Sequence, residues 1–554
     1  MTAFEQIDLN SIQDIAGARR AIVLLFNLIE DQQATIRQLQ VENQLLRDEN
    51  NRLKGEQGKP DIKPNKPPQP PASSDHSSEA ERRQPQAWRK GSKLDRIVID
   101  REETLTVDPA SLPADAEFKG HEDVVVQDVR FETANILFHK EKYYSPSAGK
   151  TYLAELPPGY TGQFGPGLKA LALVEYYACN VAEPKLLDLF RSIGVVISAG
   201  ELSNLLIKQQ ACFHAEKAAI YAAGLSSSPW QHLDQTSTRV DGVNQQCHVV
   251  CNPLYTAFFT TANKDRLSVL DVLRNLAART FRLNTEAFEL LHVLGVAQRV
   301  IVRLQALPQG QTFSEAELTT LLDQQQPPIT PTQRQHILEA TAIAAYHAQL
   351  EFPMIRLLLC DDAPQFNWLT GELALCWVHE GRHYKKLAPY VPHHQQRLAE
   401  FQKQFWDFYD ELLAYRAAPS PAEKVRLTAE FDRIFATVTG YQQLDDRIEK
   451  TRLKKASLLL VLEHPEIPLH NNPAELGARQ RVRKRDVSFG PQTADGARAW
   501  DTFQTLTGTA TKLGVSIYHY IRDRVAQAYK LPSLADLITE RAQLQPLGAS
   551  WDAT

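Results

Sequence analysis

Apolar side chains recur at helical spacing between residues 20 and 54, which predicts one long helix. In heptads, its seam consists of the a positions Ile22, Ile29, Ile36, Asn43 and Asn50 and the d positions Leu25, Gln32, Leu39, Leu46 and Leu53. Isoleucine at a with leucine at d favours a parallel two-stranded coiled coil, and asparagine at a fixes its register. We therefore predict that residues 20–54, within an N-terminal helical region 1–54, mediate self-association. The alternative is an amphipathic helix packed on its own chain.

The pattern changes twice after this helix. Residues 55–93 include six prolines within 59–71, followed by serine and charged residues, which predicts a disordered linker. From 94 to 165, short runs such as "RIVID" and "EDVVVQDV" alternate between apolar and polar side chains. Alternation of this kind is typical of strands, so we predict a small β module there.

Residues 166–225 predict a helical domain. The stretches "GLKALALVEYYACN" and "EPKLLDLFRSIG" each predict a helix, and Ser198 is suited to cap a third, "AGELSNLLIKQQ". A helix, a short turn containing glycine and a capped helix are typical of a helix-turn-helix. Small helical bundles share this pattern, so both interpretations stay open.

Strand and helix signals are interleaved between residues 226 and 490. "WQHLDQTSTRVDG", "QQCHVVCNPLYTAFFTTA", "IRLLLC" and "LALCWVHEG" predict strands. Helical spacing of apolar residues predicts two helical insertions, at 267–350 and 394–462, and a C-terminal helical segment at 491–554. The chain is therefore expected to be a multidomain α+β protein with an interrupted α/β core.

Composition limits the classes of function. The net charge is −5, so any basic surface has to be local. Six cysteines are scattered without a CxxC motif, which argues against a disulfide framework. Cys247 and Cys251 flank His248, but they fit a buried strand better than a metal site. No apolar run reaches the ~18 residues of a membrane span. We predict a soluble, cytoplasmic protein of bacterial type without membrane partners.

Carboxylates lie at the ends of predicted core elements. Asp234 belongs to the first strand, Asp361 and Asp362 follow the strand "IRLLLC", and Glu475 lies in the first turn of a helix. Carboxylates that converge at one sheet edge repel each other unless cations neutralise them. Oxygen ligands suit Mg²⁺ or Mn²⁺, and two such ions support phosphodiester chemistry. Taken singly, Asp362 also fits a turn and Glu475 a favourable helix N-terminus.

Several stretches together resemble a known family. They are "FRSIGVVISAGELSNLL" (190–206), "HLDQT" (232–236), "CWVHEGRHYKKL" (376–387), "IPLHNNPAELGARQRVRKRDVSFG" (467–490) and "FQTLTGTATKLGVSIYHYI" (503–521). In their residues and in their order along the chain, these stretches resemble the DDE transposases of the insertion-sequence-66 type over roughly residues 160–540. The Asn-Asn-Pro-Ala-Glu block is the most specific of them. The resemblance implies a ribonuclease H-like catalytic domain at 226–490.

The resemblance also implies a reaction and a metal site. Asp234, Asp361 and Glu475 would be the catalytic triad and would hold two Mg²⁺ or Mn²⁺ ions. The enzyme would cleave transposon ends at terminal inverted repeats and join the 3′-hydroxyl to target DNA. "DDAPQF" resembles the integrase pattern Asp-Asn-Gly-x-x-Phe, which makes Asp361 the metal ligand and Asp362 a supporting residue. A slip of one residue would exchange the two aspartates.

A basic surface is expected beside this triad. Its DNA-binding residues would be Arg382, Arg479, Arg481, Arg483, Lys484 and Arg485. A solvated face paired with acids is the alternative. Residues expected to support the metal ligands are His379, Asn471 and Asn472, with Arg382 and His383 along the same edge. His379 fits a buried core histidine equally well.

The chain also departs from the family pattern. Residues 95–160 contain no cysteine, so no zinc is expected, and His470 stands where the family has aspartate. These departures motivate a second hypothesis, a catalytically inactive DNA-binding or accessory protein derived from a transposase. A nuclease acting on RNA–DNA hybrids is a third, and it rests on fold alone. Accessory transposition proteins are further partners that the resemblance implies.

Overall fold

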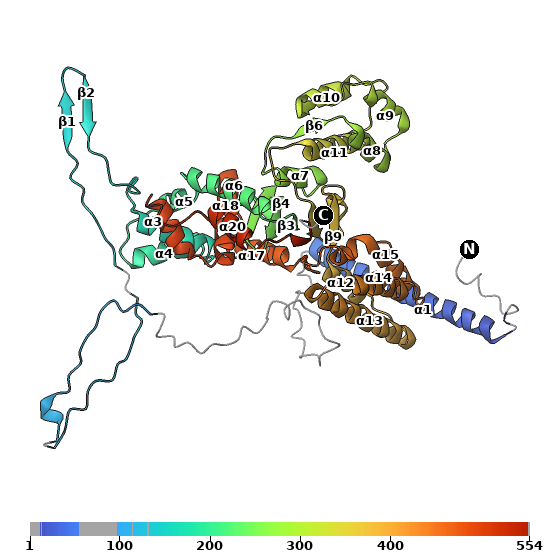
Figure 1. Cartoon of the computed structure of the whole chain (residues 1–554), viewed down its shortest axis with the longest axis horizontal. Coiled ribbons are helices and arrows are strands. Elements are labelled where there is room, and N and C mark those ends of the chain that lie inside the picture. The colour runs from blue at the N-terminus through green and yellow to red at the C-terminus, as the bar shows by residue number, and fades with distance from the viewer. Residues whose placement is uncertain (1–11, 13, 55–96, 114, 130–131, 552–554) are drawn as a thin grey trace.

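The structure is a computed structural model and describes residues 12, 14–54, 97–113, 115–129 and 132–551. It is a mixed α+β architecture in which helices predominate, as expected (Figure 1). At its centre lies a five-stranded sheet in the order β5-β4-β3-β8-β9. These strands are β3 Trp230–Val240, β4 Val243–Asn252, β5 Tyr255–Thr261, β8 Leu357–Cys360 and β9 Glu372–Leu375. β3, β4 and β5 form an antiparallel meander, and β8 and β9 continue it in parallel to β3.

Local sequence explains the form of this sheet. β3 and β4 are joined at Asp241 and Gly242, whose φ angles of 50° and 72° are those of a two-residue hairpin turn. All four residues of β8 are buried, because this parallel strand is covered on both faces. The predicted strand "LALCWVHEG" is shorter than expected. β9 ends at Leu375, and the helix α12 (Trp377–Lys385) begins after Cys376.

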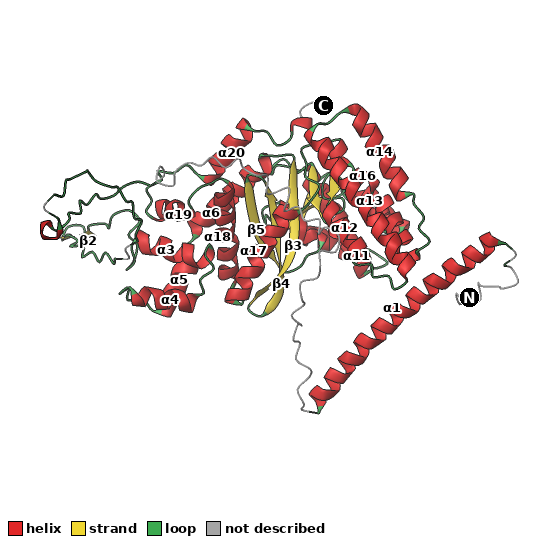
Figure 2. Cartoon of the chain, turned by 90° about the horizontal axis from the view of Figure 1, so that it is seen from below, coloured by secondary structure: helices red, strands yellow, loops and turns green. Residues whose placement is uncertain are grey.

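The outer edge of the sheet is covered by α18 (Ala494–Lys512). Backbone N–H groups of β5 donate to side chains one turn apart on this helix: Thr256 to Thr509, Phe258 to Thr505 and Thr260 to Asp501, at 3.2, 3.0 and 2.7 Å. An uncovered edge strand would leave these donors free to pair with another chain. Figure 2 shows the sheet between α18 on one side and the helices α13 (Pro392–Ala417) and α14 (Pro421–Phe435) on the other.

Both predicted insertions are largely helical. The first contains α7 Arg266–Leu273, α8 Thr285–Val293, α9 Gln298–Gln305, α10 Glu315–Asp323 and α11 Pro331–Ala348, with a small ladder of β6 Thr280–Arg282 and β7 Thr312–Ser314. The ladder was not expected. The second contains α13 Pro392–Ala417, α14 Pro421–Phe435, α15 Gln442–Arg452 and α16 Lys455–Leu458. We refer to α13–α16 as the second insert.

The expected helical region before the core is present as α3 Pro166–Tyr177, α4 Glu183–Ser192, α5 Ala199–Ile207 and α6 Ala211–Ser226. Ser198 caps α5 in a reciprocal capping box with Glu201. The C-terminal region continues with α19 Ile517–Val525 and α20 Leu534–Leu544, and α19 packs against α3. The role of α4 and α5 as a DNA reader stays a prediction.

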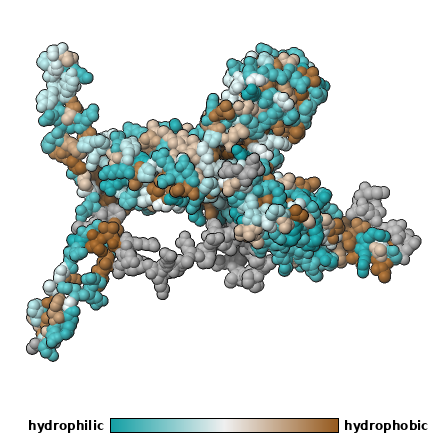
Figure 3. Space-filling model, viewed as in Figure 1, coloured by the Kyte–Doolittle hydropathy of each residue, from teal (hydrophilic) through white to brown (hydrophobic). Residues whose placement is uncertain are grey.

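The strands expected early in the 94–165 region are mostly wrong. Within its described residues the structure has one hairpin, β1 Lys142–Ser145 with β2 Lys150–Leu153. "EDVVVQDV" forms neither a strand nor a helix, and Val124 and Val126 are 76% and 80% exposed. Alternation predicts a strand only where a partner covers its apolar face. Figure 3 shows apolar side chains exposed along this projecting part of the chain.

The N-terminal helix is α1, Ile15–Leu53, in agreement with the single helix expected there. It lies against the second insert (Figure 1). The coiled coil itself stays a prediction, and the proline-rich linker lies outside the described residues. Among the helices that the structure describes, none has the length and apolar character needed to cross a membrane.

Candidate active site

A cavity of about 290 Å³ lies where β8 ends, beside β3 and the start of α17 (Asn472–Ser488). Asp234, Asp361 and Glu475 all line it, although they come from β3, the end of β8 and the first turn of α17. The structure therefore brings together three carboxylates that are far apart in the sequence. Their convergence follows from the parallel pairing of β3 with β8 and from the packing of α17 on β3.

The carboxylates in this cavity are electrostatically coupled. Burial and, to a smaller extent, the charges of Glu475 and Asp361 raise the pKa of Asp234 to about 7, although a hydrogen bond from the Gln235 amide acts in the opposite direction. Burial also raises the pKa of Asp361. Groups that resist ionisation in this way are candidates for binding a cation, because a cation relieves both the burial cost and the repulsion.

The two adjacent aspartates have different surroundings. Within the described chain, Oδ1 of Asp361 is buried and has no hydrogen-bond partner, and its side chain lines the cavity. Asp362 points elsewhere, with its carboxylate 46% exposed and 2.5 Å from the Lys454 ammonium. Lys454 also contacts the buried Glu380 at 3.1 Å. Asp361 thus has an oxygen available for a ligand, whereas Asp362 is held in an ion pair.

Glu475 is engaged by a guanidinium. Arg382 of α12 donates two parallel hydrogen bonds to it, at 3.0 and 2.9 Å. In the described residues, no three acidic, histidine or cysteine side chains are already grouped closely enough to hold a metal ion. The hard oxygen donors and the unpartnered Asp361 oxygen nevertheless suit Mg²⁺ or Mn²⁺. Glu475 could contribute once the guanidinium shares or releases an oxygen.

The start of α17 is fixed to the sheet by buried polar contacts. Asn471 is 2% exposed, donates to the Leu233 carbonyl at 2.7 Å, and accepts from His232 Nδ1 at 3.0 Å. The backbone N–H of Asn471 donates to the Cys376 sulfur at 3.2 Å. Asn471 lines the same cavity as the carboxylates, and its contacts hold the start of α17, and with it Glu475, next to Asp234. Asn472 is half-buried at the first position of α17.

A close approach of α17 to the sheet brings Glu475 within reach of the cavity. A Cβ atom added to Gly477 would lie 2.7 Å from Cγ1 of Val249 on β4. Such a contact is too short for any side chain, so only glycine allows this spacing.

His379 lines the same cavity, and its ring lies 5.2 Å from the His383 ring. Burial lowers the pKa of His383 to about 4.

A chain of amides beside the carboxylates was missed from the sequence. Gln365 donates to Gln235 at 2.8 Å, and Gln235 donates to His248 Nδ1 at 3.0 Å. His248 Nε2 then contacts the Thr261 hydroxyl at 2.7 Å. Burial lowers the pKa of His248 to about 4, so the ring is neutral and accepts from Gln235. This chain ties the loop after Asp361 to the strand that carries Asp234, and the glutamine in "HLDQT" was its available signal.

The basic residues of α17 do not form one surface, contrary to the prediction. Arg479 and Arg483 are exposed, and Arg479 lines the cavity. Arg481 and Lys484 are fully buried and cannot contact DNA phosphates. Arg481 bonds to Asp501 of α18, and Lys484 donates to the Tyr176 carbonyl of α3. Arg485 is partly exposed and donates to the Ser237 carbonyl at 2.8 Å.

The burial of Lys484 predicts a pH-dependent stability. Burial lowers the pKa of this ammonium to about 7, so the unfolded chain binds its proton more tightly between pH 7 and its ordinary value. The free energy of unfolding therefore rises with pH in that window. Relative to Lys484→Met, the wild type should gain roughly 2 kcal/mol between pH 7 and pH 9. Urea unfolding of both proteins at three pH values measures this, and a constant difference would contradict it.

Comparison with known proteins agrees with these features. The model of the Transposase IS66 family matches residues 352–499, which include Asp361 and Glu475. The "Uncharacterized protein y4jO" of Sinorhizobium fredii (strain NBRC 101917 / NGR234) is 32% identical over 324 residues, which cover 58% of this chain and 99% of that protein. No solved structure matches the chain. The chain belongs to the Transposase IS66 family.

Proposed function

We propose that this protein is a DNA transposase that cleaves the ends of a mobile element and joins the resulting 3′-hydroxyl to target DNA. The observation that carries the proposal is the convergence of Asp234, Asp361 and Glu475 on one cavity in a member of this family. The strand order supports it too. The sheet consists of three antiparallel strands continued by two parallel ones, with β3 in the centre, and this mixed sheet is compatible with the ribonuclease H-like core that the resemblance implies.

In the proposed phosphoryl transfer, some residues of the cavity would bind metal ions and others would position these ligands. Asp234 and Asp361 would hold the metals, with Glu475 as third ligand. Two bound ions would supply activation of the attacking oxygen and stabilisation of the leaving oxygen. Asn471 and the Gln235–Gln365 contact keep the carboxylates in place. Asp234 and Asp361 are partly buried, and burial raises the pKa of both, so a bound cation would stabilise their ionised forms.

Exposed arginines near the cavity suit the DNA backbone. Arg479 and Arg483 lie about one turn apart on α17, and Arg382 borders the cavity from α12. A guanidinium presents a fork of donors that fits phosphate oxygens. We propose that Arg382 exchanges Glu475 for a phosphate when DNA and metal are present. Arg481 and Lys484 have structural roles instead.

The test uses purified full-length protein and DNA duplexes that carry the inverted repeats flanking its gene, with Mg²⁺ or Mn²⁺. Cleavage at the repeat and joining of labelled ends to plasmid are expected, and duplexes with scrambled ends serve as the control. Binding without metal-dependent cleavage would instead support a non-catalytic DNA-binding protein. Cleavage confined to RNA–DNA hybrids would support a nuclease.

We also propose that two chains self-associate through the a and d positions of α1. Ile22, Leu25, Ile29, Ile36 and Leu39 are 48, 42, 37, 44 and 57% exposed in the single chain. An exposed apolar seam of this length is covered when two such helices pair. Deleting residues 14–54 should halve the mass measured by light scattering, and an unchanged mass would refute the pairing.

A further inference from the structure

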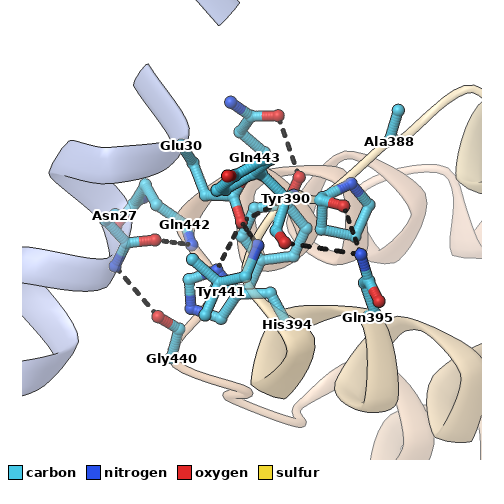
Figure 4. A network of polar contacts seen from close by, with 12 residues as sticks. Asn27, Glu30, Ala388, Tyr390, His394, Gln395, Gly440, Tyr441, Gln442 and Gln443 are labelled. Carbon is cyan, nitrogen blue, oxygen red and sulfur yellow. Dashed lines mark hydrogen bonds and ion pairs between the residues drawn. The ribbon is translucent and has the colours of Figure 1, made fainter. Parts of the chain in front are cut away.

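α1 is attached to the second insert through a small polar contact (Figure 4). Glu30 accepts hydrogen bonds from the amides of Tyr390 and Val391, both at 2.8 Å. Asn27, one turn earlier, accepts from the Gln442 amide and donates to the Gly440 carbonyl, both at 2.9 Å. These contacts join residues more than 350 positions apart in the sequence.

The contact supplies what the second insert lacks. α13 and α15 begin after Val391 and Tyr441, and neither of these N-cap residues caps its helix with a side chain. The first amides of a helix need acceptors from elsewhere, and negative charge is favourable there. Asn27 accepts from Gln442, the first residue of α15, and Glu30 accepts from Val391, the N-cap residue of α13, and from Tyr390 just before it. One helix thus provides acceptors at the start of two others.

Burial shows that the contact is specific. Glu30 is 4% exposed, although most of α1 is open to solvent. His394, itself 1% exposed, lies 3.2 Å from the Glu30 carboxylate and stacks on the Tyr441 ring at 4.6 Å. A buried carboxylate is costly unless its oxygens are hydrogen-bonded, and both oxygens of Glu30 are.

The attached face of α1 is not its apolar seam. Side chains of α1 that contact the second insert, or the residues 388–391 just before it, include Phe26, Asn27, Glu30 and Arg37. In the heptads of α1 these residues occupy positions b, e and f, whereas the seam occupies a and d. Positions b and f lie on the side of the helix away from a and d. Both faces can therefore be occupied at the same time.

We propose that α1 is a two-sided coupling helix, with Asn27 and Glu30 binding its own second insert while the a and d face binds α1 of a second copy. The inference rests on the proposed self-association. A pair of chains joined in this way would carry two second inserts in a fixed relation to each other. In each chain, Lys454 of the second insert forms an ion pair with Asp362, the residue after the cavity-lining Asp361. Pairing of two chains would therefore fix the distance and orientation between their two catalytic cavities.

Two sets of full-length variants separate the faces. Asn27→Ala with Glu30→Ala should speed hydrogen exchange in peptides covering 388–395 and 440–443 by about tenfold or more, with dimer mass unchanged. Leu25→Glu with Ile29→Glu should abolish the dimer by light scattering and leave that exchange slow. Asp31→Ala removes a neighbouring exposed carboxylate and should change neither measurement. The single variant Glu30→Gln keeps one acceptor oxygen, so peptides covering 388–395 should lose less protection from exchange in it than in the single variant Glu30→Ala.

Each remaining outcome overturns part of the proposal. Unchanged exchange in the Asn27→Ala, Glu30→Ala protein would show that α1 does not cap the second insert. Loss of the dimer in that same protein would show that the faces are not separate. A dimer that survives Leu25→Glu with Ile29→Glu would refute the coupling while leaving the capping contact intact. None of these measurements depends on transposase activity.

Discussion

Asp361→Asn should abolish strand cleavage and strand transfer, with a loss of about 10³-fold or more, because it removes a charge that the proposed metals require. Asp362→Asn should keep activity within about tenfold, because Asp362 is ion-paired with Lys454 and does not line the cavity. The comparison is sharp, since the two residues are neighbours and receive the same substitution. Initial rates on duplexes carrying the terminal repeats measure both.

A second measurement makes this test independent of turnover. Mn²⁺ binding by calorimetry should be lost or much weaker in Asp361→Asn and close to wild type in Asp362→Asn. Circular dichroism confirms that both variants are folded. The reverse ranking would move the ligand to Asp362, and equal activity in both variants would remove the cavity from the mechanism.

The position of the carboxylates could be predicted because each depends on local signals. A buried apolar run that ends in Asp361, and an Asn-Pro helix start before Glu475, can be recognised in a few residues. Parallel pairing then brings strand ends to one edge, which requires no knowledge of distant packing. The long-range pairing of Gln235 with Gln365 could be predicted only in part, because Gln235 follows Asp234 in "HLDQT" but nothing local marks Gln365 as its partner.

The basic helix shows where periodicity is insufficient. Helical spacing predicts that Arg481 and Lys484 share a face, but not that this face is turned towards the core. The small residues Ala474, Gly477 and Ala478 lie on the same face of α17 and are also buried. Small residues at this spacing were the available signal that arginine and lysine would follow them inside. The attachment of Glu30 to a segment 360 residues away could not be predicted, since nothing local distinguishes it from an exposed acid.

Arg481→Met should lower the free energy of unfolding by about 3–5 kcal/mol, one of the largest effects of any single change in this chain. Arg481 is 0% exposed and bonds to Asp501, which is 4% exposed. Within the described residues, removing the guanidinium leaves a buried carboxylate whose remaining hydrogen bonds come from Thr260, at 2.7 and 2.8 Å. Lys217, whose pKa burial lowers to about 8, is the nearby cation that would recover part of the loss.

The matched control is Arg479→Met, two residues earlier on the same helix but exposed, which should change stability by no more than about 0.5 kcal/mol. Adding Asp501→Asn to Arg481→Met should restore part of the stability, because the amide removes the unpaired charge and still accepts from Thr260. Urea unfolding of the wild type, Arg481→Met, Asp501→Asn and the double variant gives the coupling energy. A loss below about 1 kcal/mol in Arg481→Met would mean that the pair is not buried and that this side of α17 is open. Arg481 would then return to the set of DNA-binding candidates, so the same stability measurement decides which arginines of α17 can reach a phosphate.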